Sequence, residues 1–219
     1  MRKIVLLVVT LVIVASMYAC SGNSGPVSAP ANALYFDNFA SVDSGWTRLQ
    51  NELGIADYAE GYFHIAVNKA STLLIANPGQ AFPGDVSIEV DARKIGGSDD
   101  NFFGVVCHYV DPDNYYLFMI TSDGYSGIAM RKGGVDTLIS PGKNFLKMVG
   151  IKKGKATNHI QADCIGEKLV LYANGKQVSL AYDSTLTGGD VGMAARSGKL
   201  EGGIDIRFDN FTVMPVTQP

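Results

Sequence analysis

Apolar and polar residues alternate with a period of two along many short segments of this chain. The clearest case is the segment 85–93, in which Val86, Ile88 and Val90 fall on one side and polar residues on the other. A period of two is the spacing of side chains on one face of a β-strand. Similar strand patterns occur at residues 34–39, 61–67, 125–132, 158–164, 168–173, 177–181, 191–196 and 207–213. No segment shows sustained helical periodicity, so the pattern predicts an all-β, antiparallel two-sheet sandwich in one domain.

The strongest strand pair is predicted for residues 101–121, where two arms rich in Val, Phe, Tyr and Ile flank a turn. The turn reads Asp-Pro-Asp-Asn at residues 111–114, and these residue types favour a tight hairpin turn. Both arms are apolar on both faces, which is typical of central strands rather than edge strands. A second hairpin turn, of type I′, is predicted at Asn174 and Gly175. One helical turn is expected within residues 141–150.

The tetrapeptide Phe-Asp-Asn-Phe occurs twice, at residues 36–39 and 208–211. Nothing between the two copies repeats, so the tetrapeptides do not indicate a duplication. We expect instead that the first and last strands of the domain lie side by side and close the sandwich.

The first twenty residues resemble an export signal. Arg2 and Lys3 form a positively charged start, residues 4–15 are almost entirely apolar, and Cys20 stands where cleavage is expected. The apolar stretch is shorter than the roughly 20 residues that span a membrane. The pattern resembles a bacterial lipoprotein signal, in which Cys20 would carry the lipid and anchor the protein at the cell surface or in the periplasm. Ordinary secretion and an uncleaved anchor are the alternatives.

Domain boundaries follow from these patterns. Residues 1–20 are the predicted signal, residues 21–33 are a small, polar, proline-containing tether, residues 34–215 are the sandwich, and residues 216–219 are a tail.

Composition narrows the function classes. The chain has 219 residues with 25 glycines, 10 tyrosines and 10 phenylalanines, which suits many short strands joined by tight turns. Its net charge of −3, without a stripe of lysine and arginine, argues against a nucleic-acid partner.

Two cysteines remain once Cys20 is assigned to the lipid. Cys107 and Cys164 each fall on the apolar side of a predicted strand, and an exported chain meets oxidising conditions. We therefore predict a disulfide between them, and two buried free thiols are the alternative. The closed loop of 57 residues would stabilise the fold by about 4 kcal/mol.

Eight fragments occur in a characteristic order along the domain. They are Phe-Asp-Asn-Phe at 36–39, Ser-Gly-Trp at 44–46, Gly-Tyr-Phe at 61–63, Ile-Glu-Val-Asp-Ala at 88–92, Phe-Gly-Val-Val at 103–106, Leu-Val-Leu-Tyr-Ala-Asn-Gly at 169–175, Gly-Asp-Val-Gly at 189–192 and Phe-Asp-Asn-Phe at 208–211. This order resembles the concanavalin A-like jelly roll shared by legume-type lectins, laminin-G-like modules and family 16 glycoside hydrolases. It is also similar to 3-keto-disaccharide hydrolase domains. These motifs specify the fold more than the activity.

The resemblance to family 16 hydrolases implies a catalytic Glu-x-Asp-x-x-Glu strand, and the sequence lacks one. Glu89 and Asp91 begin such a motif, but no second glutamate follows, so we interpret them as a solvated strand face paired with Arg93. No histidine lies near a nucleophile-elbow sequence, and the scattered histidines and cysteines do not have the spacing of a zinc site. The sequence names no catalytic residue.

No cofactor is required by these patterns, but a structural Ca²⁺ is possible by resemblance. Family 16-like sandwiches often bind calcium with a carboxylate of the closing strand, and Asp209 matches that position, with Asp37 as its neighbour. The alternative is that both aspartates cap turns or bond backbone groups.

A ligand-binding face is predicted opposite the core side of Cys107. Alternation places His108 there, and cross-strand alternation adds Tyr115 and Met119. The remaining predicted members of this binding face are Gln161 and Asp163 from a neighbouring hairpin and Arg131 and Trp46 at the rim. Aromatic rings that stack on sugars, beside polar groups that bond hydroxyls, are typical of glycan binding. The alternative is that a loop or helix covers this face and Trp46 belongs to the core.

The sequence therefore favours a surface-anchored, non-catalytic module that binds a carbohydrate or another envelope component. An enzyme of the 3-keto-disaccharide hydrolase type is the alternative, and a structural adhesion module is a third reading. The expected partners are a glycan or envelope component and, through the lipid, a membrane.

Overall fold

The computed structural model describes residues 27–199 and 202–216. The predicted export signal, with Cys20, and the last three residues of the predicted tail lie outside this part of the chain. Within the described residues no helix is long and apolar enough to cross a membrane.

Two antiparallel sheets form the domain, as the alternating pattern predicts. The nine-stranded sheet has the order β15-β14-β13-β7-β17-β4-β3-β2, with β1 paired to β17. Its strands are β1 (Tyr35–Asp37), β2 (Leu49–Asn51), β3 (Gly54–Ala59), β4 (Tyr62–Val67), β7 (Val86–Gly97), β13 (Thr157–Ile165), β14 (Lys168–Ala173), β15 (Lys176–Tyr182) and β17 (Ile204–Pro215).

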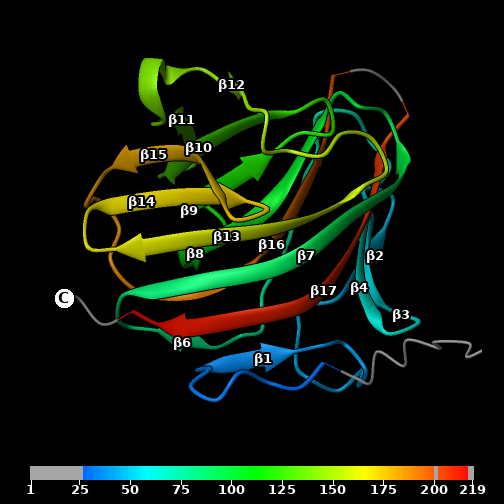
Figure 1. The fold of residues 1–219 in the computed structure, drawn as a ribbon. Helices are drawn as coiled ribbons and strands as arrows, with labels where there is room; N and C mark the ends of the chain where they lie inside the picture. Colours follow the sequence, from blue (N-terminus) through cyan, green and yellow to red (C-terminus); the bar gives the residue numbers. More distant parts are fainter. Residues whose placement is uncertain (1–26, 200–201, 217–219) are drawn as a thin grey trace, which may run out of the picture.

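The eight-stranded sheet has the order β11-β10-β9-β8-β16-β5, with β12 paired to β10 and β6 to β16. Its strands are β5 (Leu73–Ala76), β6 (Ala81–Phe82), β8 (Asn101–Asp111), β9 (Asn114–Ile120), β10 (Tyr125–Lys132), β11 (Val135–Leu138), β12 (Leu146–Lys147) and β16 (Gly189–Ser197). In the part of the chain that the structure describes, the single helical element is the short 3₁₀ turn η1 (Pro141–Lys143), inside the segment expected to hold one turn. Figure 1 shows β7, β13 and β17 of one sheet lying across β8, β9 and β16 of the other.

The predicted central hairpin is β8 and β9. Both strands lie inside the eight-stranded sheet, because β8 has β9 and β16 as neighbours and β9 has β8 and β10. The backbone N–H of Asp113 donates to the side chain of Asp111 at 2.8 Å, so an Asx turn joins the two strands. At the second predicted turn, Asn174 and Gly175 both have positive φ, of 52° and 75°, as a type I′ turn requires.

The ends of the domain meet as predicted. β1 pairs with β17 in antiparallel register, with Asp37 opposite Phe211. The two Phe-Asp-Asn-Phe tetrapeptides therefore lie on neighbouring strands.

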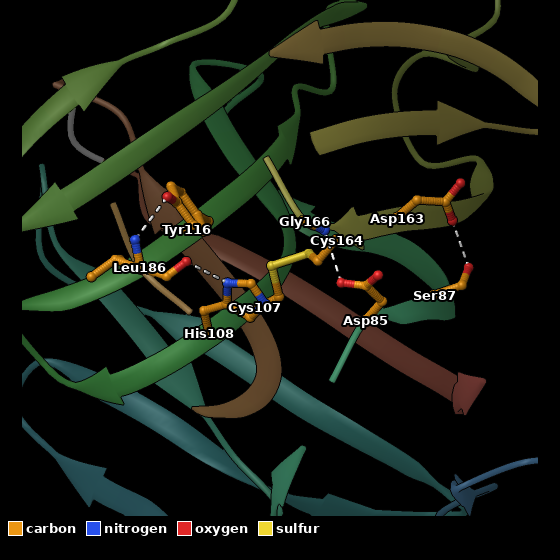
Figure 2. Close-up of a disulfide and its surroundings, with 9 residues drawn as sticks. All are labelled: Asp85, Ser87, Cys107, His108, Tyr116, Asp163, Cys164, Gly166 and Leu186. Atoms are coloured by element: carbon orange, nitrogen blue, oxygen red, sulfur yellow. Dashed lines mark hydrogen bonds between the residues drawn. A yellow bond between two sulfur atoms is a disulfide. The ribbon is translucent and has the colours of Figure 1, made fainter. Parts of the chain in front are cut away.

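The core lies between the two sheets and is built from the inward side chains of both. Its largest fully buried members include Phe63, Phe103, Tyr116, Phe118 and Phe208. The disulfide between Cys107 of β8 and Cys164 of β13 crosses this core and joins the two sheets (Figure 2). The predicted disulfide is therefore confirmed.

Candidate functional site

A groove runs over the outer face of the eight-stranded sheet, on the side away from the core. Its volume is about 640 Å³, within the range of about 300–1,000 Å³ that is typical of ligand sites. We call it the apolar groove. It is lined by Ser71, Leu73, Ile75, Phe102, Tyr109, Pro112, Tyr115, Leu117, Met119, Ala129, Arg131, Asp136, Leu138, Phe145 and Arg196.

Strand alternation builds most of the floor. In β9, Tyr116 and Phe118 point into the core, so Tyr115, Leu117 and Met119 point outward into the groove. The neighbouring strand β10 sets Arg131 directly opposite Tyr115 and Ala129 opposite Leu117. Predicted positions Tyr115, Met119 and Arg131 are therefore brought together in one site.

A bulge in β8 supplies a second tyrosine to the groove. His108 has a left-handed backbone, with φ of 49°, and the pairing of β8 with β16 shifts by one residue there. An extra residue in one strand moves the following side chains to the other face. Tyr109 consequently faces the groove and stacks on Tyr115, with ring centroids 5.7 Å apart and an angle of 19° between the rings.

The prediction that His108 lies on the ligand face is wrong. Its ring is buried, lies 5.8 Å from the ring of Tyr116, and its Nδ1 donates to the carbonyl oxygen of Leu186 at 2.9 Å (Figure 2). Burial lowers the pKa of His108, so the ring is neutral at neutral pH. The bulge is the physical reason, because it turns His108 away from the outer face and replaces it with Tyr109.

An arginine with its carboxylate partners stands at the Tyr115 end of the groove. Arg131 Nη1 lies 2.9 Å from Asp136 Oδ1, and its Nη2 lies 3.5 Å from Asp113 Oδ1. Its Nε donates to the carbonyl oxygen of Pro112 at 3.1 Å. This network holds the guanidinium in place beside Tyr115.

The other end of the groove is formed by two stacked phenylalanines and a second arginine. The rings of Phe102 and Phe145 stack with centroids 6.5 Å apart, and the guanidinium of Arg196 lies 5.4 Å from the centroid of Phe102. Among the described residues Arg196 has no carboxylate partner within ion-pair distance. Its N–H groups are therefore available to a ligand.

The groove continues beyond these rings into a polar section of about 450 Å³. Ser71, Phe102, Phe145 and Arg196 line both sections, so the two are continuous. The polar section is further lined by Asp99, Asp100, Asn101, Thr121, Asp123, Tyr125, Ser197, Gly198 and Lys199.

Both groove tyrosines are neutral hydrogen-bonding groups at physiological pH. Burial, with the nearby charge of Asp136, raises the pKa of Tyr115 to about 12. Burial and the charge of Asp111 raise the pKa of Tyr109 above its usual value. Neither hydroxyl has a hydrogen-bond partner among the described residues, so each can donate to or accept from a bound molecule.

Gln161 and Asp163 do not belong to this groove, and their placement there is wrong. They lie on β13 in the nine-stranded sheet, where Asp163 accepts hydrogen bonds from Ser87 at 2.7 Å and from Gln161 at 3.0 Å. Cys107 and Cys164 face each other across the core, so side chains that point away from them emerge on opposite surfaces of the sandwich. Figure 2 shows Asp163 and Ser87 on the far side of the disulfide from His108.

Trp46 is a core residue and not part of a rim. Its side chain is buried and lies against Phe39, Phe63 and Phe211. Its Nε1 donates to Asp37 Oδ2 at 2.9 Å, which satisfies its one polar group. The alternative interpretation of Trp46 was therefore the correct one.

Several residues that line the groove were not predicted from the sequence. Phe102 and Val106 are an even number of positions apart on the same strand, so alternation places Phe102 on the outer face together with Val106. Alternation does not predict the position of Tyr109, because the bulge after Cys107 moves the following side chains to the opposite face. Strand β16 pairs with β8, and β5 pairs with β16, which brings Leu73, Ile75 and Arg196 to the groove. No local sequence pattern predicts these pairings.

A small polar pocket of about 200 Å³ lies on the outer face of the opposite, nine-stranded sheet. Asp91 and Asp209 lie directly opposite each other there, on β7 and β17. The predicted partner of Asp91, Arg93, is replaced by His159, whose Nδ1 lies 2.9 Å from Asp91 and whose Nε2 lies 3.5 Å from Glu89. The reason is cross-strand pairing, because β13 sets His159 opposite Asp91.

The two aspartates of this pocket have opposite pKa shifts. The hydrogen bond from His159 lowers the pKa of Asp91. Burial, together with the charges of Asp91 and Asp37, raises the pKa of Asp209. The hydrogen bonds from His159 to Asp91 and Glu89 raise the pKa of His159 to about 9, so it is protonated at neutral pH.

The predicted calcium residues lie near each other, but Asp37 is already occupied. Its carboxylate accepts hydrogen bonds from Trp46 Nε1, from the Ser44 hydroxyl and from the backbone N–H of Phe39. Within the described residues no group of three or more acidic, histidine or cysteine side chains could hold an ion. A calcium ion would have to use Asp209 with backbone oxygens, so its binding stays a prediction.

Solved structures with this architecture include both sugar-binding and sugar-cleaving proteins. A carbohydrate-binding module, CBM66 from Bacillus subtilis, is 18% identical with a TM-score of 0.53, over 78% of this chain and 96% of that one. A Bacillus subtilis protein of unknown function with a galectin-like fold is 11% identical with a TM-score of 0.64, over 86% and 98%. A Bacillus licheniformis β-glucanase is 10% identical with a TM-score of 0.60, over 85% and 100%.

No family model matches the sequence. No curated protein sequence matches it either. At the identities of the solved structures the likeness establishes the fold alone. The chain is a jelly-roll sandwich, as its resemblance to the concanavalin A-like proteins implied.

Proposed function

We propose that the apolar groove binds a glycan or another component of the cell envelope, without catalysing a reaction on it. The stacked pair of Tyr109 and Tyr115 carries this proposal. The pair presents aromatic surface with two free hydroxyls beside the fixed guanidinium of Arg131. Rings of this kind stack on sugar faces, and the hydroxyl and guanidinium groups bond sugar hydroxyls. The structural likeness to CBM66, a carbohydrate-binding module, supports the same conclusion.

The non-catalytic part of the proposal rests on the acids of the groove. Among the described residues that line the apolar section, Asp136 is the one carboxylate, and it is paired with Arg131. The acids of the polar section also have partners: Asp99 pairs with Lys94, Asp100 accepts from the backbone N–H of Lys199, and Asp123 accepts from the Thr121 hydroxyl. Hydrolysis of a glycosidic bond normally requires two carboxyl groups that flank the bond.

The test compares two alanine variants on a glycan array and then by calorimetry with the best-bound glycan. Tyr115→Ala is expected to weaken binding about tenfold, because it removes one stacked ring. Gln161→Ala is the matched control on the opposite sheet and is expected to bind like the unchanged protein. Equal loss in both variants, or binding unaffected by Tyr115→Ala, would remove the groove as the site.

A hydrolase of 3-keto-disaccharides is the second candidate, and one observation favours it. Asp91 lies directly opposite Asp209 on the neighbouring strands β7 and β17. The pKa of Asp91 is lowered and that of Asp209 is raised. Such a division is how an acid and a base are set in carboxylate enzymes. If this candidate is correct, the protein hydrolyses a 3-keto-glucoside and Asp209→Asn abolishes the activity. Absence of hydrolysis by the unchanged protein would end it.

We further propose that the protein is exported and held at the cell envelope by a lipid on Cys20, in keeping with the signal pattern of residues 1–20. Labelling of cells with a radioactive fatty acid tests this. The label is expected in the unchanged protein and not in Cys20→Ser, and label in both would contradict it.

A further inference from the structure

The segment between β11 and β13 concentrates positive charge on a protein whose net charge is negative. Residues 141–156, which we call the basic loop, contain Lys143, Lys147, Lys152, Lys153 and Lys155. The sequence has no aspartate or glutamate between Asp136 and Asp163. Figure 1 shows η1 and β12, which belong to this loop, together at the top of the sandwich.

The lysines of the basic loop are exposed, and the ammonium of one of them, Lys147, lies over the ring of Tyr125, 6.0 Å from its centroid. All five lysines are exposed, and so is Lys176, whose side chain lies next to Gly150 of the loop. In the part of the chain that the structure describes, none of these six ammonium groups is in an ion pair.

Two acids lie at the base of the loop. Asp123 neighbours Gly124, over which the side chain of Lys153 lies, and Asp91 is close enough to Lys152 for that charge to help lower its pKa. Asp91 is already paired with protonated His159. The basic loop is therefore strongly positive after its neighbours are counted.

An apolar side chain projects from the middle of these charges. Val149 is 99% exposed, and Leu146 is also exposed. Phe145 is as exposed as Leu146, but its ring stacks on Phe102 and lies next to Gly127, which fastens the loop to the wall of the groove. Lysines around projecting aliphatic side chains are typical of segments that contact the surface of an anionic bilayer.

We propose that the basic loop docks on an anionic lipid bilayer, with Val149 inserted at the interface and the lysines beside the lipid headgroups. A soluble polyanion would satisfy the lysines equally well, but it offers nothing to Val149. The exposed valine is therefore what selects a bilayer. This docking would hold the adjoining groove close to the membrane surface, independently of any lipid on Cys20.

The experiment uses a chain that begins at Ser21, so that neither the apolar residues 4–15 nor Cys20 contributes. Every described strand lies between Tyr35 and Pro215, and these strands share one core, so this chain keeps the whole fold. Its co-sedimentation is measured with vesicles of one part phosphatidylglycerol to two parts phosphatidylcholine. Vesicles of pure phosphatidylcholine are the reference.

Binding to the anionic vesicles alone is expected, and it should disappear at an ionic strength of about 1 M, where charges are screened within about 3 Å. Lys152→Gln with Lys153→Gln should weaken the binding about 30-fold, because each lysine near such a surface contributes a factor of about five. Val149→Ser should weaken it about tenfold, the effect of keeping one valine in water.

The matched control is Lys132→Gln with Lys168→Gln. It makes the same change of charge at two places far from the loop. Lys132 ends β10, whereas Lys147 of the loop pairs with Tyr125 at the start of that strand. Lys168 begins β14 and pairs with Ile165 at the end of β13, whereas the loop precedes the start of β13. The control is expected to bind like the unchanged chain, and all variants should melt at the same temperature.

Equal binding to neutral vesicles, or equal loss in the control, would overturn the proposal. Salt-sensitive binding of soluble polyglutamate together with no effect of Val149→Ser would also overturn it, and would assign the loop to an anionic polymer.

Discussion

The left-handed backbone of His108 decides which aromatic side chain faces the groove. Alternation assigns that place to His108, but the bulge turns its ring toward Tyr116 and brings Tyr109 onto Tyr115. A β-bulge depends on how two strands pair, because one extra residue must be accommodated opposite its partner. Nothing within residues 101–121 of the sequence identifies His108 as that extra residue.

His159 illustrates the opposite case, in which a residue acquires its chemistry from a neighbouring strand. Its pKa rises to about 9 because Asp91 and Glu89 accept hydrogen bonds from its ring. In the unfolded chain the pKa of histidine is about 6.5. Because the pKa is higher in the folded protein, protonated His159 stabilises the fold fully at pH values below about 6.5. The stabilisation is lost as the pH rises to about 9.

We therefore expect His159→Gln to reduce the free energy of unfolding in a pH-dependent way. The loss should be about 1 kcal/mol near pH 6, since this pair is partly exposed and screened by water, and close to zero near pH 10. Urea unfolding of both proteins at the two pH values measures it. Both proteins contain His108, so its contribution cancels when their free energies of unfolding are subtracted. A loss of stability that does not change with pH would contradict the raised pKa of His159.

At the scale of elements, the strands with strong alternation were predictable and the short ones were not. β10 (Tyr125–Lys132) has the bounds that the sequence predicts. β5 and β11 were missed, because Leu73–Ala76 and Val135–Leu138 are too short to show a period. Both lie beside the groove and contribute Leu73, Ile75 and Leu138 to it. The ligand site was thus less predictable than the core.

Among the described residues, the disulfide is the one covalent link between elements of different sheets. It joins β8 to β13 and closes a loop over a sequence separation of 57 residues. A link of this length restricts the unfolded chain and stabilises the fold by about 4 kcal/mol in the chain-entropy model.

Cys107→Ala combined with Cys164→Ala is accordingly expected to lower the free energy of unfolding by about 4 kcal/mol. Urea unfolding with and without reductant measures this. Reductant should destabilise the unchanged protein and leave the double variant unaffected. Two titratable thiols in the native oxidised protein would show that the link does not form.

For the whole molecule, the assignment of strands to two sheets separates two kinds of surface. The outer face of the eight-stranded sheet carries the apolar groove, and that of the nine-stranded sheet carries ion pairs such as Asp91 with His159 and Arg48 with Asp57. Gln161 and Asp163 belong to the second surface because β13 pairs with β7. Strand alternation does not determine to which sheet a hairpin belongs, so residues of both surfaces were predicted to share one face.

The calcium prediction belongs to this scale, because Asp209 lies on β17, the last strand of the domain, which pairs with the first strand β1. Dialysis against a chelator, followed by addition of calcium, tests it through the melting temperature. A calcium-dependent rise that is absent in Asp209→Asn would support the prediction. Identical melting temperatures with and without the chelator would end it.

The sequence by itself determined the all-β class, the central hairpin, the meeting of the terminal strands and the disulfide. These features follow from the period of the side chains, from turn residues and from two cysteines on apolar faces, all of which are local. The tertiary structure alone decided the content of the groove and the pairing of His159 with Asp91. Those features depend on a bulge and on which strands become neighbours, and neighbours far apart in the chain are selected by the packing of the whole sandwich.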